Sequence, residues 1–329
     1  MNVSPSQDIL SGKTADVYFR RTLDVLKAEG LNPVTTMEIF PNRKGVLCGI
    51  KEALGLLRAV LPCPQSEVWA LPEGEAMENK EVILRIKAPY QSYGLYETAL
   101  CGMLAHGSGW ATAARECVEA AGGIPVISFG ARHVHPNVAG VMDYAAVTGG
   151  CKACSSILGA EMTGTLPSGT MPHSLILIMG DTVKATLAFD RHMPESIGRV
   201  ALVDTFKDEA EESLRVAEAL GQRLASIRLD TPAERGRVTV ELVREVRARL
   251  DLAGFGYVKI FVSGGLDAER IRMFVDSGAP ADGFGVGSYI SGARPIDFTA
   301  DIHEVDGRPI AKRGRIPGIT PNQRLVRII

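Results

Sequence analysis

The chain has 329 residues, of which 46% are hydrophobic and 22% are charged, and its formal net charge is −2. This composition is ordinary for a globular protein, and the length allows two domains. A near-neutral charge excludes the broad basic field of a nucleic-acid-binding protein, so any anion-binding surface must be local. Residues 1–8 lack the basic start and apolar stretch of a secretory signal, and no apolar run approaches the ~20 residues of a membrane span. We therefore expect a cytoplasmic protein with no nucleic-acid or membrane partner.

The six cysteines are too sparse for a disulfide framework in a chain of this size. Cys151 and Cys154 form a C-x-x-C pair, but no second pair and no closely spaced histidine pair completes a zinc site. We expect buried thiols at helical spacing and no zinc.

Residues 1–110 are predicted to form an α+β domain of their own. Its expected elements, in chain order, are a helix over 13–27, short β-rich pieces over 34–71 that include a helix over 49–61, a half-exposed strand over 81–88, and a helix over 93–105. A further helix is predicted over 111–121, ending at Gly122-Gly123.

Residues 111–290 repeat one pattern, in which a short β-branched run and a polar or glycine-rich strand end precede a helical stretch. The expected strands cover 124–129, 199–206, 225–230, 258–265 and 281–287, with helices over 137–148 and 172–189 among them. Strands that alternate with helices indicate a parallel α/β sheet, which can close into a barrel. The loops at the carboxyl ends of barrel strands form the active site. Residues 291–329, with possible strands at 302–305 and 325–329, are expected to return to the first domain.

Two successive strand ends are rich in glycine. Ser263-Gly264-Gly265 follows an apolar strand and precedes a helix, so its backbone N–H groups meet the positive end of that helix. Gly283-Phe284-Gly285-Val286-Gly287 ends the next strand, and the last two loops of a barrel commonly bind one phosphate. Either set alone is also typical of tight turns. Together they predict phosphate binding by Ser263, Gly264, Gly265, Gly285 and Gly287, while the G-x-G-x-G spacing argues against a dinucleotide-binding fold.

Ionisable side chains end two other strands. Asp204 lies near the end of one strand, and alternation places Arg228 and Asp230 on the same side of the next. One interpretation is structural, with a salt bridge at the barrel rim or Asp230 capping a turn before Pro232. The other is functional, with the carboxylates holding sugar hydroxyls or Mg²⁺ and the arginine binding phosphate oxygens.

The first strand end and a later loop carry two more candidates. Phe129 beside Arg132 suits a flat, anionic ligand such as a pyridine carboxylate, although a core aromatic and a surface arginine would give the same pattern. His133 and His135 lack a nearby acid or cysteine, so a metal role is not expected. His173 follows a polar loop and opens an apolar helix, where it could cap the helix or serve as a nucleophile or acid–base group.

These motifs, taken in chain order, resemble those of nicotinate phosphoribosyltransferases, in the family that also contains nicotinamide and quinolinate phosphoribosyltransferases. The resemblance covers nearly the whole chain. It is carried by Thr14-Ala15-Asp16-Val17-Tyr18-Phe19 with Arg21-Thr22, Ser128-Phe129-Gly130-Ala131-Arg132, Gly169-Thr170-Met171-Pro172-His173-Ser174, Val203-Asp204-Thr205 and the two glycine loops.

The resemblance implies an incomplete parallel α/β barrel with a smaller N-terminal α+β domain, in a homodimer whose subunits share active sites. The implied substrate-binding residues are Asp16 and Tyr18 of the partner subunit, Phe129, Arg132 and Thr170, with the pyridine ring between Tyr18 and Phe129. The implied catalytic residues are His173, Asp204, Arg228 and Asp230, with Mg²⁺ at Asp204 and Asp230. A histidine in the position of His173 can be phosphorylated by ATP in this family, which couples nucleotide hydrolysis to the transfer.

The implied reaction joins nicotinate to phosphoribosyl pyrophosphate and gives nicotinate mononucleotide and pyrophosphate, a step of NAD biosynthesis. One departure concerns the base: Lys152 stands where the family is expected to have an acidic or small polar residue. Quinolinate, or another pyridine acid, is the alternative substrate. A non-catalytic barrel that binds a phosphorylated metabolite is an alternative of another class, and a lyase or isomerase would need a strand-end lysine, for which Lys259 is poorly placed.

Overall fold

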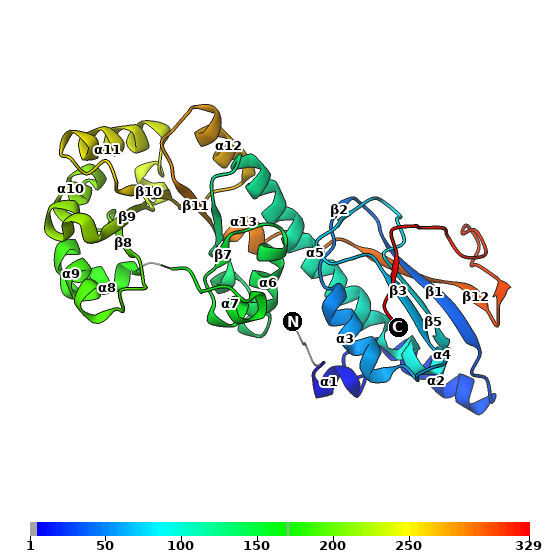
Figure 1. Cartoon of the computed structure of the whole chain (residues 1–329). Helices are drawn as coiled ribbons and strands as arrows, with labels where there is room; N and C mark the ends of the chain where they lie inside the picture. Colours follow the sequence, from blue (N-terminus) through cyan, green and yellow to red (C-terminus); the bar gives the residue numbers. More distant parts are fainter. Residues whose placement is uncertain (1–4, 170) are drawn as a thin grey trace. The chain divides into compact units, whose positions relative to one another are not determined.

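The computed structural model describes residues 5–169 and 171–329 (Figure 1). The chain forms two compact units, which are described separately. One comprises the described part of Met1–Thr112 together with Ala293–Ile329, and the other comprises the described part of Ala113–Gly292. In the part of the chain that the structure covers, no helix combines the length and apolar composition needed to cross a membrane.

The first unit is built on a six-stranded antiparallel sheet in the order β13-β12-β1-β5-β3-β14. Its strands are β1 (Val34–Pro41), β3 (Glu67–Ala70), β5 (Leu84–Pro89), β12 (Phe298–Val305), β13 (Arg308–Pro309) and β14 (Val326–Arg327), beside a small β2 (Gly45–Val46) and β4 (Ala76–Met77) pair. Its helices are α1 (Gln7–Leu10), α2 (Val17–Ala28), α3 (Ile50–Val60), α4 (Tyr90–Tyr93) and the first part of α5 (Glu97–Ala120). Because β12 pairs with β1, residues from both ends of the chain share this sheet.

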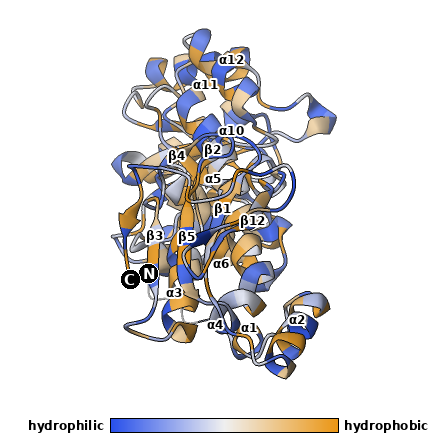
Figure 2. Cartoon of the chain, turned by 90° about the vertical axis from the view of Figure 1, so that its right-hand side faces the viewer, coloured by the Kyte–Doolittle hydropathy of each residue, from blue (hydrophilic) through white to orange (hydrophobic). Residues whose placement is uncertain are grey.

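The core of this unit follows from the pattern of its strands and helices. β1 is buried along nearly its whole length, and β5 alternates buried and half-buried residues, as a strand with one covered face should. Figure 2 shows hydrophobic residues along β1, β5 and α3, and these elements supply much of the apolar core.

Two helices of this unit differ from the sequence predictions. α2 begins at Val17 rather than at residue 13, because Asp16 takes the N-cap position and α1 forms a separate turn before it. The helices predicted over 93–105 and 111–121 are one helix, α5. The glycines that interrupt its apolar pattern allow close packing instead of ending the helix: a Cβ at Gly109 would lie 2.6 Å from the Arg294 carbonyl oxygen.

The second unit contains a six-stranded parallel sheet in the order β7-β6-β11-β10-β9-β8. Its strands are β6 (Val126–Ser128), β7 (Ala153–Cys154), β8 (Arg199–Leu202), β9 (Leu224–Leu229), β10 (Lys259–Val262) and β11 (Gly283–Val286). Its helices are α6 (Pro136–Thr148), α7 (Ile157–Thr163), α8 (His173–Met179), α9 (Thr182–His192), α10 (Glu209–Leu220), α11 (Val240–Leu252), α12 (Ala268–Asp276) and α13 (Ser288–Ser291).

This sheet is curled, with β7 and β8 as its two edges, so it is a half-barrel (Figure 1). α10 connects β8 to β9, α11 connects β9 to β10, and α12 connects β10 to β11. These three helices lie on the outer side of the sheet. The predicted fold class, an incomplete parallel α/β barrel with a smaller α+β part, is confirmed. All carboxyl ends of the strands meet at one rim, which brings together residues distant in sequence.

Two local predictions for this unit are wrong. The helix expected over 172–189 is two helices, because Gly180 adopts a left-handed φ of +74° and the Asp181 side chain then caps α9 by accepting from Lys184 N–H. Cys151 and Cys154 are buried thiols as predicted, but Cys154 lies in β7, so their spacing is not helical. Gly283 and Gly285 lie within β11, inside the strand predicted over 281–287.

Candidate active site

A cavity of about 370 Å³ opens at the carboxyl rim of the half-barrel. Five of the six strands contribute to it. Its lining consists of residues from the ends of β6, β7, β9, β10 and β11 and from the segments that follow them: Phe129, Ala131, Arg132, His133, Ser155, Arg228, Asp230, Ser263, Gly264, Gly265, Gly285, Gly287 and Ser288. The structure therefore gathers every predicted residue from the ends of β6, β9, β10 and β11 around one space.

The loop between β10 and α12 has the form of a phosphate cradle. Gly264 and Gly265 adopt φ angles of +91° and +65°, which L side chains rarely take, so glycine is needed at both positions. Their backbone N–H groups have no protein acceptor among the described residues, whereas the Ser263 N–H donates to the Leu229 carbonyl. Asp267 then caps α12 by accepting from Arg270 N–H at 2.8 Å. The loop thus offers unpaired N–H groups beside the start of a nine-residue helix.

The glycines of β11 make room for an aromatic ring. A Cβ at Gly285 would lie 2.5 Å from Cε2 of Phe129, and one at Gly287 would lie 3.1 Å from Cε1 of His133. Both glycines line the cavity, but the clearest contribution of Gly285 is that it lets the Phe129 ring lie across the strand.

The guanidinium stacked on Phe129 belongs to Arg228. Arg228 Cζ lies 4.8 Å from the centroid of the Phe129 ring, and Arg132 lines the same cavity. Arg228 reaches the ring from β9, so the stacked cation comes from another strand than the ring's sequence neighbour Arg132. Together the two side chains form an aromatic and cationic surface suited to a flat anion.

Arg228 and Asp230 lie on the same side of their strand end, as alternation predicted. Arg228 Nη2 donates to Asp230 Oδ2 at 3.1 Å, and Arg228 Nε donates to Ser263 Oγ at 2.7 Å. Ser263 Oγ in turn donates to Asp230 Oδ1 at 2.7 Å. The structural interpretation, a salt bridge at the rim, therefore holds, and the same pair also lines the cavity. This network fixes the end of β9 to the glycine loop that follows β10.

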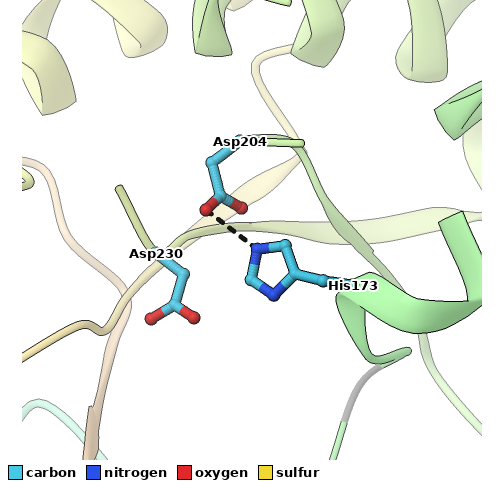
Figure 3. A group of neighbouring side chains, drawn as sticks. All are labelled: His173, Asp204 and Asp230. Carbon is cyan, nitrogen blue, oxygen red and sulfur yellow. Dashed lines mark hydrogen bonds and ion pairs between the residues drawn. The ribbon is translucent and has the colours of Figure 1, made fainter. Parts of the chain in front are cut away.

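Figure 3 shows His173, at the start of α8, pointing toward Asp204 and Asp230. His173 Nε2 lies 3.0 Å from Asp204 Oδ2, and one ligand atom from each of the three residues lies within 4.8 Å of the others. The hydrogen bond to Asp204 raises the pKa of His173 above its ordinary value, partial burial opposes this, and the Asp204 and Asp230 charges add to it. This environment stabilises the protonated form of His173 relative to that of a free histidine, although 41% of its side chain is exposed.

Asp204 lies two residues beyond β8 rather than inside the predicted strand, and its side chain is only 2% exposed. Its second oxygen, Oδ1, is buried and has no hydrogen-bond partner in the part of the chain that the structure describes. A buried carboxylate oxygen without a hydrogen-bond partner destabilises the folded state unless a ligand binds to it. Paired carboxylates are donors that Mg²⁺ accepts, so Asp204 and Asp230 fit the predicted metal, while the imidazole of His173 suits it less.

Two predicted residues belong to the other unit and form a cluster there. Tyr18 Oη donates to Asp16 Oδ2 at 3.1 Å, and Thr98 Oγ1 donates to the same oxygen at 2.8 Å. The Asp16 hydrogen bond raises the pKa of Tyr18, and burial raises the pKa of nearby Glu97 to about 7. The ring of Tyr18 is 57% exposed. Thr170 lies outside the described residues, and the roles assigned to all three remain predictions.

Sequence reasoning did not select several residues of the cavity, among them His133 and Ser155. Asp143, which is fully buried, supports this wall because it accepts from Ser128 Oγ at 2.8 Å and from Ser156 N–H at 2.9 Å. His133 could have been found from its place next to Arg132 in a strand-end segment. Asp143 lies within α6 rather than at a strand end, and its partners Ser128 and Ser156 are more than ten positions away in the chain. No sequence motif therefore marks it as part of this wall.

The fold and the site define an α/β half-barrel protein with a cavity of aromatic, cationic and glycine-rich lining at the carboxyl ends of its strands. A model of the N-terminal domain of quinolinate phosphoribosyl transferase matches residues 16–108, and a model of its C-terminal domain matches residues 110–301. The chain therefore belongs to the quinolinate phosphoribosyl transferase family, which confirms the resemblance seen in its motifs.

Individual relatives are named either as phosphoribosyltransferases of nicotinate (nicotinic acid) or as a nicotinate-nucleotide pyrophosphorylase. Nicotinate phosphoribosyltransferase pncB2 of Mycobacterium tuberculosis is 33% identical over 266 residues, which are 79% of this chain and 56% of that protein. The chain spans about half the length of the curated relatives it matches. The crystal structure of nicotinate-nucleotide pyrophosphorylase from Pyrococcus furiosus is 45% identical, with a TM-score of 0.89 over 97% of this chain and 82% of that one. Human nicotinic acid phosphoribosyltransferase, at 19% identity and a TM-score of 0.74 over 92% of this chain and 77% of that one, shares the fold.

Proposed function

We propose that the protein transfers the phosphoribosyl group of phosphoribosyl pyrophosphate to the ring nitrogen of nicotinate, giving nicotinate mononucleotide and pyrophosphate. The observation that carries the proposal is the single cavity lined by an aromatic ring, two arginines, a carboxylate and a glycine loop, with Asp204 and His173 close to Asp230. The curated relatives named nicotinate phosphoribosyltransferase support the choice of base.

The chemistry requires few groups. The bond between ribose C1 and the pyrophosphate oxygen breaks, and a bond from C1 to the pyridine nitrogen forms. The ribose ring is positive in between, and the nitrogen lone pair attacks without losing a proton. Rate enhancement therefore comes from alignment and from stabilisation of the departing charge, with little need for a general base.

Each group around the cavity suits one part of the substrates. The Phe129 ring and the Arg228 guanidinium would hold the pyridine carboxylate, and Arg132 would hold pyrophosphate oxygens. The N–H groups of Gly264 and Gly265 would bind the 5′-phosphate. Asp204 and Asp230 would hold Mg²⁺, which supplies positive charge to the leaving pyrophosphate when it is bound.

We further propose that ATP can phosphorylate His173 and so couple its hydrolysis to the transfer. The support is geometric: Asp204 binds Nε2, the other ring nitrogen lies on the side away from Asp204 (Figure 3), and the side chain is half-exposed. A dimer is part of the same proposal, with Asp16 and Tyr18 of one copy completing the cavity of the other. Mixing Tyr18→Ala chains with His173→Ala chains should then restore up to a quarter of the activity, and a mixture as inactive as its components would contradict shared sites.

The test is a direct assay of the purified protein with nicotinate, phosphoribosyl pyrophosphate and Mg²⁺, with and without ATP. We expect release of pyrophosphate together with nicotinate mononucleotide, and loss of both when the metal is chelated. Phosphate release from ATP that depends on nicotinate would support coupling. Absence of pyrophosphate release under every condition would refute the function, and ligand-induced stabilisation without turnover would favour a non-catalytic binding protein.

Quinolinate is the second candidate base. Its support is that both matching family models carry the quinolinate name. With quinolinate, the same bond would form at the ring nitrogen and the adjacent carboxylate would leave as carbon dioxide. Competition between nicotinate and quinolinate, with carbon dioxide measured alongside pyrophosphate, decides between the two.

A further inference from the structure

The segment between β9 and α11 places an arginine directly against the phosphate loop. A Cβ added to Gly265 would lie 1.6 Å from Nη1 and 2.8 Å from Cζ of Arg237. The guanidinium of Arg237 therefore occupies the space that a side chain at position 265 would need. Gly265 lines the cavity, so this cation lies at the edge of the phosphate cradle.

Arg237 adopts an unfavourable backbone conformation to reach this place. Its φ is +65°, directly after Gly236 with a φ of +87°. Side chains with a Cβ rarely adopt this region, and a second glycine would fit without strain. Such strained residues cluster at ligand-binding sites, which points to a use for the side chain rather than for the backbone.

No described residue neutralises the charge of Arg237. Its guanidinium has no hydrogen bond or ion pair to any of the described residues, although the side chain is half-buried. Arg228, the other cation near the loop, is already paired with Asp230. The loop from Ser263 to Leu266 carries no carboxylate of its own, and the Asp230 carboxylate beside Gly264 is held by Arg228 and Ser263. A half-buried cation beside unpaired N–H groups is an arrangement that an anion would complete.

We propose that Arg237 binds the phosphate ester of the sugar substrate, opposite the N–H groups of Gly264 and Gly265. This inference rests on the proposed function and extends it, because it names a residue for the 5′-phosphate that neither the motifs nor the cavity lining assigned. The planar guanidinium can donate two parallel hydrogen bonds to phosphate oxygens. It also brings a positive charge, which the backbone N–H groups lack.

The experiment measures two quantities on the full-length protein: binding of ribose 5-phosphate by calorimetry, and the KM for phosphoribosyl pyrophosphate with Mg²⁺ and nicotinate. Arg237→Gln should weaken ribose 5-phosphate binding and raise this KM, each roughly 10- to 100-fold, with a smaller change in kcat. Arg237→Lys should give an intermediate loss, because it keeps the charge but not the fork. Arg235→Gln is the matched control, since Arg235 is exposed in the same segment and loses the same charge, and it should stay within threefold.

Arg237→Gly separates binding from folding. Glycine relieves the strain at φ +65°, so the thermal midpoint should not fall, while ribose 5-phosphate binding should be lost as in Arg237→Gln. The proposal is overturned if Arg237→Gln binds ribose 5-phosphate as tightly as the unaltered protein, or if the unaltered protein does not bind it. Failure of turnover alone, with binding that depends on Arg237, would instead remove the proposed reaction and leave this site standing.

Discussion

Two buried carboxylates, one in each unit, are used in opposite ways. Glu38 of the antiparallel sheet is fully buried, and both of its oxygens are engaged: Oε1 accepts from Arg85 Nε at 2.7 Å and from Thr320 N–H at 3.2 Å, and Oε2 accepts from the same N–H at 3.3 Å. Asp204 of the half-barrel is nearly as buried, but only one of its oxygens has a partner among the described residues, and that partner is the half-exposed His173.

The difference separates a carboxylate whose oxygens are both bound within the fold from one with an oxygen that no described residue binds. A paired, buried carboxylate ties β1 and β5 to the C-terminal segment, and its loss would leave Arg85 without its partner. An incompletely paired one lies at the carboxyl rim of parallel strands, where the loops of barrel proteins carry function. Burial alone would have assigned both residues to the core. What distinguishes them is whether both carboxylate oxygens have hydrogen-bond partners.

The sharpest test of this contrast is Asp204→Asn. We expect kcat/KM for pyrophosphate release to fall about 100- to 1000-fold, as when a group that stabilises transition-state charge is removed. The thermal midpoint should stay constant or rise, because the substitution removes a buried charge with an unpaired oxygen. Turnover within tenfold of the unaltered enzyme would show that Asp204 is structural after all.

Glu38→Ala should show the reverse behaviour. Removing one partner of a buried ion pair leaves Arg85 uncompensated, and the free energy of unfolding of this unit should fall by about 3 kcal/mol. Both tryptophans, Trp69 and Trp110, lie in this unit, so their fluorescence in a urea titration reports its unfolding. Activity per folded molecule should remain within twofold. A change of less than 1 kcal/mol would contradict the assignment of Glu38 to the fold.

The aromatic wall of the cavity offers a smaller effect. Phe129→Leu removes the ring beneath Arg228 while keeping an apolar side chain, and the KM for nicotinate should rise about 10-fold. The KM for phosphoribosyl pyrophosphate should change less. Phe261→Leu is the control, because the Phe261 ring lies 6.1 Å from Phe129 and outside the cavity lining. Equal effects of the two substitutions on the nicotinate KM would assign Phe129 to packing alone.

The smallest expected effect is the pH dependence of stability that His173 confers. Its pKa is raised in the folded state, so its contribution is fully present below the ordinary value of 6.5 and is lost as the pH rises through the raised pKa. Solvent screens the half-exposed side chain, so the effect should be slight. We expect the difference in thermal midpoint between the unaltered protein and His173→Gln, measured without Mg²⁺, to be larger in acid than in alkali. A difference that grows with pH would mean that Asp204 does not hold the protonated histidine.

Much of the half-barrel could be predicted because its signals are local. The change from β-branched runs to helical stretches marks each unit of the sheet, and a two-residue spacing is enough to place Arg228 and Asp230 on one side. The helix boundaries were less predictable. Gly109 looks like a break in sequence, yet it lies inside α5 because the Arg294 backbone packs against it.

The sequence by itself therefore determined the α/β class, the rim that carries the polar strand ends and most of the side chains around the cavity, since these depend on residues a few positions apart. Only the tertiary structure decided which of these side chains meet. Arg228 rather than Arg132 stacks on Phe129, Arg237 packs on Gly265, and Asp204 keeps an unpaired oxygen. The two contacts join residues at or after the ends of separate strands, and the curl of the sheet sets the distance between those strand ends. No local pattern of residues encodes that distance.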